Sequence, residues 1–153
     1  MSRAFVKESD GEPIEPPDRP VSAHPNFVTT QGLEAIEREL ARLQAEHAAV
    51  MQTGDKAAIA GAFRDLRYFT ARRASAQVIE PPADLSEVHF GATVTVRRGD
   101  GRTQTFRIVG EDEAEPARGT LSHVSPLARA LFGKRVGDNV EVAGGDAEIL
   151  AIK

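Results

Sequence analysis

The amino-acid sequence predicts an α+β fold, in which an N-terminal antiparallel helical hairpin is followed by a small β-sheet domain with one short helix. Two observations predict this order. Apolar residues recur at alternating spacings of three and four over residues 30–79, interrupted once at Gly54 and Asp55, which is typical of two paired helices. After Pro82 the apolar period becomes two, which is typical of half-buried strands. We therefore divide the chain into a tail at 1–27, a coiled-coil hairpin at 28–82 and a C-terminal domain at 83–153.

Composition narrows the classes of function. The chain of 153 residues is 41% hydrophobic, enough for a packed core, and carries 19 Lys+Arg against 23 Asp+Glu. The net charge of −4 argues against a general nucleic-acid or anionic-membrane binder, since those proteins need a basic surface. The absence of Cys excludes disulfides, thiolate nucleophiles and Cys-based zinc sites. No apolar run approaches the roughly 20 residues that span a membrane, and the opening residues lack the apolar core of a signal peptide, so we expect a cytoplasmic protein.

The N-terminal segment differs from the rest of the chain. Residues 1–26 hold five of the nine prolines, among acidic side chains. Such a segment cannot bury enough apolar surface to order itself. We expect an extended tail, with a disordered one as the alternative.

The helical hairpin has recognisable boundaries. We expect Thr30 to act as the N-cap of the first helix, Gly54 to take a left-handed conformation after it, and Asp55 to cap the second helix. The second helix must end before Pro81, and each arm is about 30 Å long. The predicted seam residues are Leu33, Ile36, Leu40, Leu43, His47 and Val50 in the first arm, and Ile59, Ala62, Leu66, Phe69, Arg73 and Ala76 in the second.

The C-terminal domain is predicted to hold five strands. Residues 88–110 read as a β-hairpin around Gly99-Asp100-Gly101, and an acidic loop follows to Gly119. Ser125, Pro126 and Gly133 mark the cap, first turn and end of a short helix. The remaining strands are predicted at 121–124, 139–142 and 147–152, the last two around the turn Gly144-Gly145-Asp146.

Four strings of the C-terminal half are distinctive: Ala76-Gln77-Val78-Ile79, then FGATVTV from Phe90, RIVGEDEA from Arg107, and SPLARALFGK from Ser125 with Val136-Gly137-Asp138 after it. In content and order they closely resemble the C-terminal domain of the Gre family (GreA/GreB) of bacterial transcript-cleavage factors. Thr29-Thr30-Gln31-Gly32-Leu33 is similar to the start of the family's first helix, so the resemblance covers residues 28–153.

The resemblance implies a partner and a mechanism. A Gre-like protein would dock its C-terminal domain, which is similar to FKBP-type folds, on bacterial RNA polymerase beside the secondary channel, and its coiled coil would reach inside. There two acidic residues of the hairpin tip help to hold a Mg²⁺ ion of the polymerase active centre, a cation that prefers hard oxygen ligands. We expect the chain to have no cofactor and no metal site of its own.

The tip departs from the family pattern. The family reads Gly-Asp, two residues, then Glu-Asn, whereas this chain reads Gly54-Asp55-Lys56-Ala57-Ala58-Ile59, so only Asp55 matches an acid and Ala58 stands in place of the second. Asp55 is then at most an auxiliary Mg²⁺ ligand, and the alternative is a plain helix cap. The hairpin also looks shorter than in typical members, by about 10 Å in each arm.

Two further groups of residues are candidates for contacts. Lys56, Arg64 and Arg67 can form a basic track for the polymerase channel, nascent RNA or DNA, or simply a solvated helix face. Asp65 is expected to pair with a neighbouring Arg of the same helix. The candidates for polymerase docking are Asp112, Glu113, Ser125, Pro126 and Arg129, although an acidic loop and a helix cap explain them equally well.

The leading functional hypothesis is therefore a Gre-like elongation regulator that is an accessory factor of RNA polymerase and not an enzyme, with transcript cleavage weak or lost. One alternative is an FKBP-like peptide-binding or prolyl isomerase module, for which Phe90, Phe106 and Phe132 offer a sparse aromatic lining. Another is a coiled-coil interaction protein. We expect a monomer that does not bind membranes.

Overall fold

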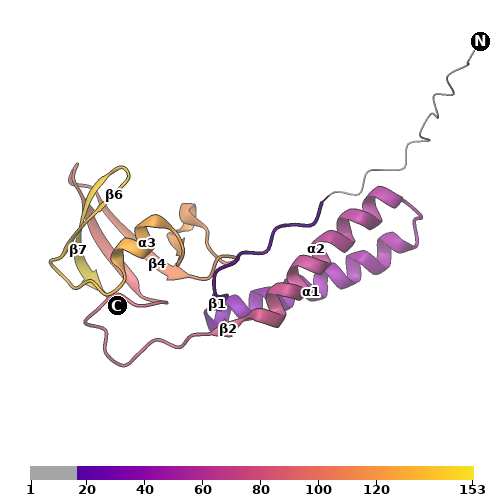
Figure 1. The fold of residues 1–153 in the computed structure, drawn as a ribbon, viewed down its shortest axis with the longest axis horizontal. Coiled ribbons are helices and arrows are strands. Elements are labelled where there is room, and N and C mark those ends of the chain that lie inside the picture. Colours follow the sequence, from indigo (N-terminus) through magenta and orange to yellow (C-terminus); the bar gives the residue numbers. More distant parts are fainter. Residues whose placement is uncertain (1–16) are drawn as a thin grey trace, which may run out of the picture.

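A computed structural model describes residues 17–153. It is an α+β structure in which two long helices project from one side of a curled sheet (Figure 1). The first sixteen residues of the predicted tail lie outside the described part. The helical part comprises β1 (Phe27–Val28), α1 (Thr30–Met51), α2 (Lys56–Ser75) and β2 (Gln77–Val78). The sheet part comprises β3 (Thr93–Arg98), β4 (Thr103–Val109), the 3-10 helix η1 (Pro116–Arg118), β5 (Thr120–Ser122), α3 (Pro126–Leu131), β6 (Asn139–Val142) and β7 (Gly145–Ile152).

Helices α1 and α2 form the predicted hairpin, with two corrections. The cap of α1 is Thr29, not Thr30: its backbone is extended and its side chain accepts a hydrogen bond from the backbone N–H of Gly32. At the other end of the hairpin the prediction is confirmed, since Gly54 has a φ of +67° and Asp55 caps α2. The second correction concerns the last turn of α2, where Arg72 is buried and the predicted seam residue Arg73 is exposed.

A short parallel ladder closes the base of the hairpin. Strand β1, just before α1, pairs with β2, just after α2, through Phe27 opposite Gln77 and Val28 opposite Val78. Two residues per strand carry no detectable alternation, so the sequence did not predict this ladder. Because β1 follows the N-terminal segment directly, the ladder also brings residues 17–26 alongside α2 (Figure 1).

The C-terminal sheet has the strand order β5-β4-β3-β7-β6. All neighbours are antiparallel except β4 and β5, which are parallel because η1 connects them as a crossover. The predicted hairpin around residues 99–101 is confirmed, although its first strand begins at Thr93 and not at residue 88. Strand β7 begins at Gly145, so the turn before it lies one residue earlier than predicted.

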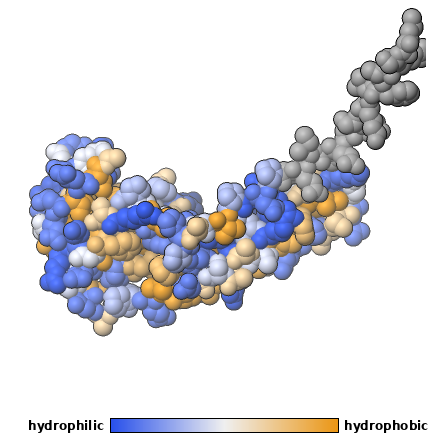
Figure 2. Space-filling model, in the orientation of Figure 1, coloured by the Kyte–Doolittle hydropathy of each residue, from blue (hydrophilic) through white to orange (hydrophobic). Residues whose placement is uncertain are grey.

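Helix α3 covers one face of this sheet and completes the core. Ala128 and Leu131 of α3 are fully buried against Val94, Ile108 and Ile149 of three different strands. Ser125 caps the helix as predicted, accepting a hydrogen bond from the N–H of Ala128. Within residues 17–153 no helix is long and apolar enough to cross a membrane. Hydrophilic residues cover most of the face seen in Figure 2, and apolar ones lie in small separate areas.

Candidate functional site

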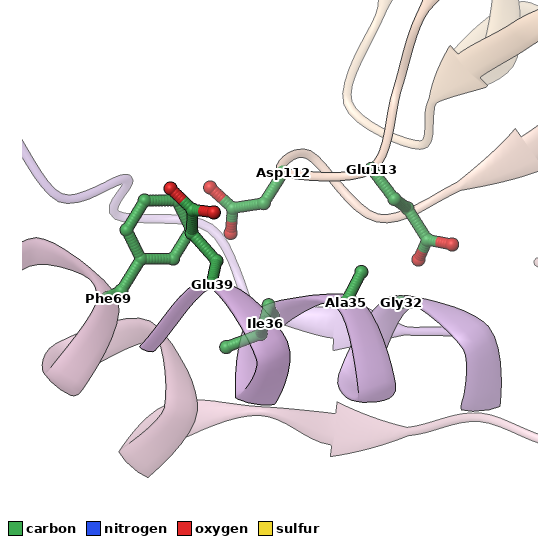
Figure 3. Close-up of a pocket in the computed structure, with 7 residues that line it drawn as sticks. All are labelled: Gly32, Ala35, Ile36, Glu39, Phe69, Asp112 and Glu113. Carbon is green, nitrogen blue, oxygen red and sulfur yellow. The ribbon is translucent and has the colours of Figure 1, made fainter. Parts of the chain in front are cut away.

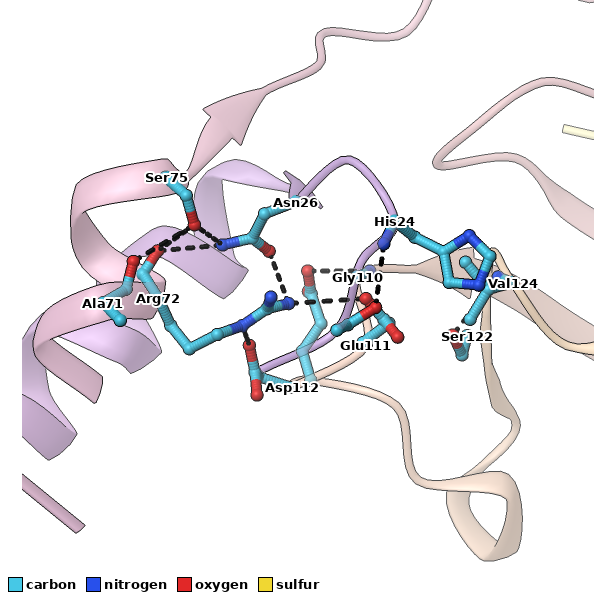
Figure 4. Close-up of polar contacts among 12 residues, drawn as sticks. His24, Asn26, Ala71, Arg72, Ser75, Gly110, Glu111, Asp112, Ser122 and Val124 are labelled. Carbon is cyan, nitrogen blue, oxygen red and sulfur yellow. Dashed lines mark hydrogen bonds and ion pairs between the residues drawn. The ribbon is translucent and has the colours of Figure 1, made fainter. Parts of the chain in front are cut away.

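The two parts of the molecule meet at a buried arginine. The side chain of Arg72, at the base of α2, is only 1% exposed. Its Nε donates to Asp112 Oδ2 at 2.5 Å, its Nη2 donates to Asn26 Oδ1 at 2.7 Å, and Nη2 lies 3.5 Å from Glu111 Oε2 (Figure 4). Asn26 in turn donates from Nδ2 to the backbone oxygen of Arg72 at 2.8 Å. A single guanidinium therefore joins α2, the N-terminal segment and the acidic loop after β4.

Asp112 holds a second residue of α2. Its Oδ1 accepts a hydrogen bond from the Tyr68 hydroxyl at 2.5 Å. Burial, and then the hydrogen bond to the Asp112 carboxylate, raise the pKa of Tyr68 to about 12, because both disfavour the phenolate. The Asp112 side chain is only 11% exposed, so this predicted polymerase-docking carboxylate is mainly engaged within the chain.

Glu113, the other acidic docking candidate, fastens the start of α1. It accepts hydrogen bonds from the Thr29 hydroxyl at 2.5 Å, the Thr29 N–H at 3.1 Å and the Gly110 N–H at 3.2 Å. A Cβ at Gly32 would lie 2.1 Å from Glu113 Oε2, so the carboxylate occupies the space that a side chain there would need. A glycine in the first turn of the helix thus makes room for an interdomain carboxylate.

A pocket of 240 Å³ lies between α1, α2 and the acidic loop (Figure 3). Ile36 and Phe69 supply apolar surface, and carboxylates approach from the loop and from α1. Its lining residues are Gly32, Ala35, Ile36, Glu39, Phe69, Asp112 and Glu113. Asp112 and Glu113 face this pocket while bonded to their own chain, so it is part of the joint between hairpin and sheet domain.

The remaining docking candidates lie at the start of α3. Ser125 is partly buried by its capping role, whereas Pro126 and Arg129 are exposed. Arg129 donates from Nη2 to His24 Nε2 of the N-terminal segment at 3.2 Å. Nearby, His123 packs against Phe27 and Phe90 with ring centroids 5.4 and 5.5 Å away, and burial lowers its pKa. Pro126 and Arg129 thus offer surface that a partner can reach.

The hairpin tip carries one carboxylate in a capping role. Asp55 Oδ1 accepts hydrogen bonds from the N–H groups of Ala57 and Ala58 at 3.1 and 3.2 Å. Ala58 supplies no oxygen, and Lys56 is exposed beside it. Among residues 17–153 no three His, Cys, Asp or Glu side chains gather as a metal site. The tip therefore does not fit Mg²⁺ by itself, since that ion takes most of an octahedron of oxygen ligands.

The basic track on α2 is partly covered. Arg67 donates from Nε and Nη2 to Asp18 Oδ1, at 2.9 and 2.5 Å. The Nε of Arg64 is buried without a hydrogen-bond partner in the part of the chain that the structure describes. Asp65 pairs at 3.3 Å with Arg19, from 46 residues earlier, so the expectation of a partner on its own helix was wrong.

The structure separates the predicted residues into two regions. Asp55 and Lys56 lie at the free end of the hairpin, and the docking candidates lie at its base or beyond, in the sheet domain (Figure 1). Arg72 and Asn26, which join the domains, were missed by sequence reasoning. Arg72 lies one residue before the predicted seam position Arg73, and its partner Asp112 lies 40 positions further along the chain. No spacing rule connects residues so far apart, so the sequence gave only a weak signal for this contact.

Comparison with known proteins relates this chain to transcription factors. Residues 82–153 match the family described as "Transcription elongation factor, GreA/GreB, C-term". The chain is 34% identical over 134 residues to transcription elongation factor GreA of Desulfovibrio desulfuricans, covering 75% of this chain and 83% of that protein. It is 36% identical over 135 residues to GreB of Neisseria meningitidis serogroup A, with the same coverage. GreA of Chloroflexus aggregans is 36% identical over 141 residues, covering 77% and 88%.

Solved structures align over most of the chain but with low scores. The GreA factor homolog 1 (Gfh1) of Thermus thermophilus has a TM-score of 0.39 at 19% identity, covering 85% of this chain and 99% of that one. The GreA/GreB protein of Nitrosomonas europaea has a TM-score of 0.41 at 19% identity, covering 85% and 98%. TM-scores below 0.5 do not establish a common arrangement of the two parts. The sequence matches are therefore what relates this chain to known proteins.

Proposed function

Because this chain belongs to the GreA/GreB family of transcription elongation factors, we propose that it regulates elongation by binding RNA polymerase at the secondary channel with little or no stimulation of transcript cleavage. The sheet domain, FKBP-like in this proposal, docks on the polymerase, and the hairpin enters the channel. The observation that supports the loss of cleavage comes from the hairpin tip. Asp55 is the single acid there, and its carboxylate caps α2.

The tip chemistry supports a factor that occupies the channel without cutting RNA. Positioning a second Mg²⁺ needs several hard oxygen ligands, and replacing a carboxylate by the methyl group of Ala58 removes one or two of them. The Asp55 oxygen that remains is shared with two backbone N–H groups. Any Mg²⁺ would belong to the polymerase active centre. Asp55 would help to bind it only if the hydrogen bonds to the N–H groups of Ala57 and Ala58 were broken.

The joint supports the mechanical part of the proposal. The buried Arg72 and the Glu113 carboxylate fix the hairpin base to the sheet domain through charge-assisted hydrogen bonds. A domain docked outside the channel can then aim the hairpin into it. Within this proposal Asp112 and Glu113 act mainly by setting that direction, while Pro126 and Arg129 contact the polymerase.

The isomerase or peptide-binding alternative gains no support. Phe106 and Phe132 pack against the hydrophobic core, and Phe90 is only 8% exposed and makes edge-to-face contacts with Phe27 and His123. A peptide pocket needs aromatic rings that line an open cavity. The pocket in Figure 3 is instead lined by residues of both helices and the acidic loop.

Polymerase binding tests the proposal directly. Elongation complexes assembled from the cognate RNA polymerase are titrated with the full chain and complex formation is followed by native mass spectrometry. We expect binding by the wild type and weaker binding by Arg129→Glu. The matched control is Arg102→Glu, an exposed arginine on the turn between β3 and β4. No wild-type binding, or equal weakening by both variants, would contradict the proposed docking surface.

A further inference from the structure

A segment before the hairpin is ordered against α2. Residues 17–25, which we call the strap, form no helix or strand yet run alongside α2 toward the joint (Figure 1). The strap is held at its start by Asp18 and Arg19 and is followed by Asn26, which is fixed at Arg72. Its composition predicts a tail without tertiary contacts, so the contacts that Asp18 and Arg19 make with α2 need an explanation.

Two consecutive strap residues reach two different kinds of group on α2. Asp18 places its carboxylate on the guanidinium of Arg67. Arg19 places its guanidinium 4.0 Å from the centre of the Tyr68 ring and 5.4 Å from that of Phe69, and pairs with Asp65. An anion on arginine next to a flat group on an aromatic ring is the pattern with which proteins hold single-stranded nucleic acid.

The face of α2 around the strap has the chemistry for such a ligand. Arg64 lies one turn before Arg67 on the helix and has no carboxylate within salt-bridge distance among residues 17–153. Phe63 is 43% exposed, and the Arg67 guanidinium lies 4.4 Å from its ring centre. Two arginines, the exposed ring of Phe63 and the partly buried ring of Tyr68 therefore lie along this face, which suits phosphates and stacked bases.

We propose that the strap is an internal competitor of single-stranded RNA for this face of α2. The Asp18 carboxylate occupies the place of a phosphate on Arg67, and the Arg19 guanidinium occupies the place of a base on Tyr68. This inference rests on the proposed function in one respect, since RNA in the polymerase channel is the natural source of the ligand. An acidic protein surface would meet Arg67 equally well but would make no use of the aromatic rings.

The contacts are suited to exchange. The side chains of Asp18 and Arg67 are 70% and 40% exposed, so water and salt reach the ion pair and it contributes little to holding the strap. An RNA strand that brings several phosphates has the advantage of releasing bound counterions. The strap thus lowers RNA affinity without blocking it, and RNA that is concentrated at the channel displaces it.

The test uses a labelled single-stranded RNA of 12 nucleotides and fluorescence anisotropy, with no polymerase. The double variant Asp18→Ala/Arg19→Ala removes the contacts of these two strap residues with α2 and leaves the net charge unchanged. We expect it to bind the RNA about tenfold more tightly than the wild type, as for a weak exposed ion pair and a cation–π contact released together. Adding Arg67→Ala should abolish the gain, whereas adding Arg42→Ala, on the outer face of α1, should leave most of it.

Two controls make the outcomes decisive. Asp100→Ala/Arg102→Ala removes an equivalent charge pair on a distant turn and should not change RNA affinity. Tyr68 is the only tyrosine of the chain, so its ring NMR signals report on the strap directly. When RNA is added to the wild type, these signals should shift and at saturation should approach those of the RNA-bound Asp18→Ala/Arg19→Ala variant.

The inference is wrong if the strap variant gains no RNA affinity, if the distant control gains equally, or if the gain survives loss of Arg67. Tighter binding of an acidic peptide but not of RNA would assign the face to a protein partner and would also overturn it. Because the assay contains no polymerase, its result is independent of whether the chain binds that enzyme.

Discussion

The buried Arg72 yields a quantitative prediction about the joint between the domains. In Arg72→Met the packed aliphatic part is kept and the guanidinium is lost, which leaves Asp112 and Glu111 without their buried cation and Asn26 without a donor. Removing one partner of a buried pair costs about 3–5 kcal/mol. Since the Asp112 and Glu111 side chains are still 11% and 21% exposed, water compensates in part and we expect a loss of about 3 kcal/mol.

The adjacent residue provides a matched control. Arg73 also lies in the last turn of α2 and pairs with Glu37 at 2.9 Å, but both side chains are almost half exposed. An exposed pair contributes about 0–1 kcal/mol, so Arg73→Met should change stability by less than 1 kcal/mol. Both variants lose one positive charge, and therefore differences between them report on the buried contacts of Arg72 and not on net charge.

Urea unfolding followed by circular dichroism at 222 nm measures the helical hairpin. For slopes of about 1–3 kcal/mol/M, a loss of 3 kcal/mol lowers the midpoint by roughly 1–3 M for Arg72→Met, against a small fraction of that for Arg73→Met. In a double-mutant cycle with Asp112→Asn the two losses should not add, because the second change removes a carboxylate already without its partner. Equal midpoints for Arg72→Met and Arg73→Met would refute the reasoning.

Two further predictions concern the same joint. Gly32→Ala should destabilise the protein by about 1–3 kcal/mol in urea unfolding, since its Cβ displaces the Glu113 carboxylate, although alanine is the better helix former. Gly61→Ala, with open space around its Cβ, should stabilise α2 by up to about 1 kcal/mol, and a stabilised Gly32→Ala would contradict the predicted clash. Absorbance titration of Tyr68 should give a pKa of about 12, and Asp112→Asn should lower this pKa only in part, because burial, the larger cause of the shift, remains. Because the pKa of Tyr68 is raised on folding, this stabilisation is full below pH 10 and is lost as pH rises through 12. A pKa near 10 in the wild type would mean that the hydroxyl is solvated.

Local chemistry was sufficient to predict most of the fold. Gly54 and Asp55 are adjacent, and each has a conformational reason to end or begin a helix, so the tip could be located from the sequence. The same holds for Ser125 and Pro126 at the start of α3. In both cases the residues that determine the structure are neighbours in the chain.

Contacts between distant segments were missed or misassigned. Thr29 and Thr30 are both competent caps, and the carboxylate of Glu113, 84 positions away, is what holds the Thr29 hydroxyl and N–H in the folded chain. The heptad pattern placed Arg73 in the seam, but the last turn of α2 packs on the acidic loop and the N-terminal segment as well as on α1. That third surface rotates the buried position to Arg72.

The sequence singled out acidic residues of the candidate site, but it did not show which contacts they make within the chain. The sequence identified Asp112 and Glu113 as important acids, and the structure places both at the joint, each bonded to the helical part. Their contact with polymerase remains a prediction, as does that of Pro126 and Arg129. Asp65 found its partner in Arg19 because the strap lies against α2, an arrangement that no spacing rule expresses.

RNA shortening in stalled, backtracked elongation complexes tests the central claim most directly. The chain is added at concentrations at which it saturates the cognate polymerase, and the length of the labelled RNA is followed over time beside a reaction without factor. We expect complexes to form while the RNA shortens no faster than in the factor-free reaction. Rapid shortening that disappears in Asp55→Ala would contradict it, because one capping carboxylate would then be enough for cleavage.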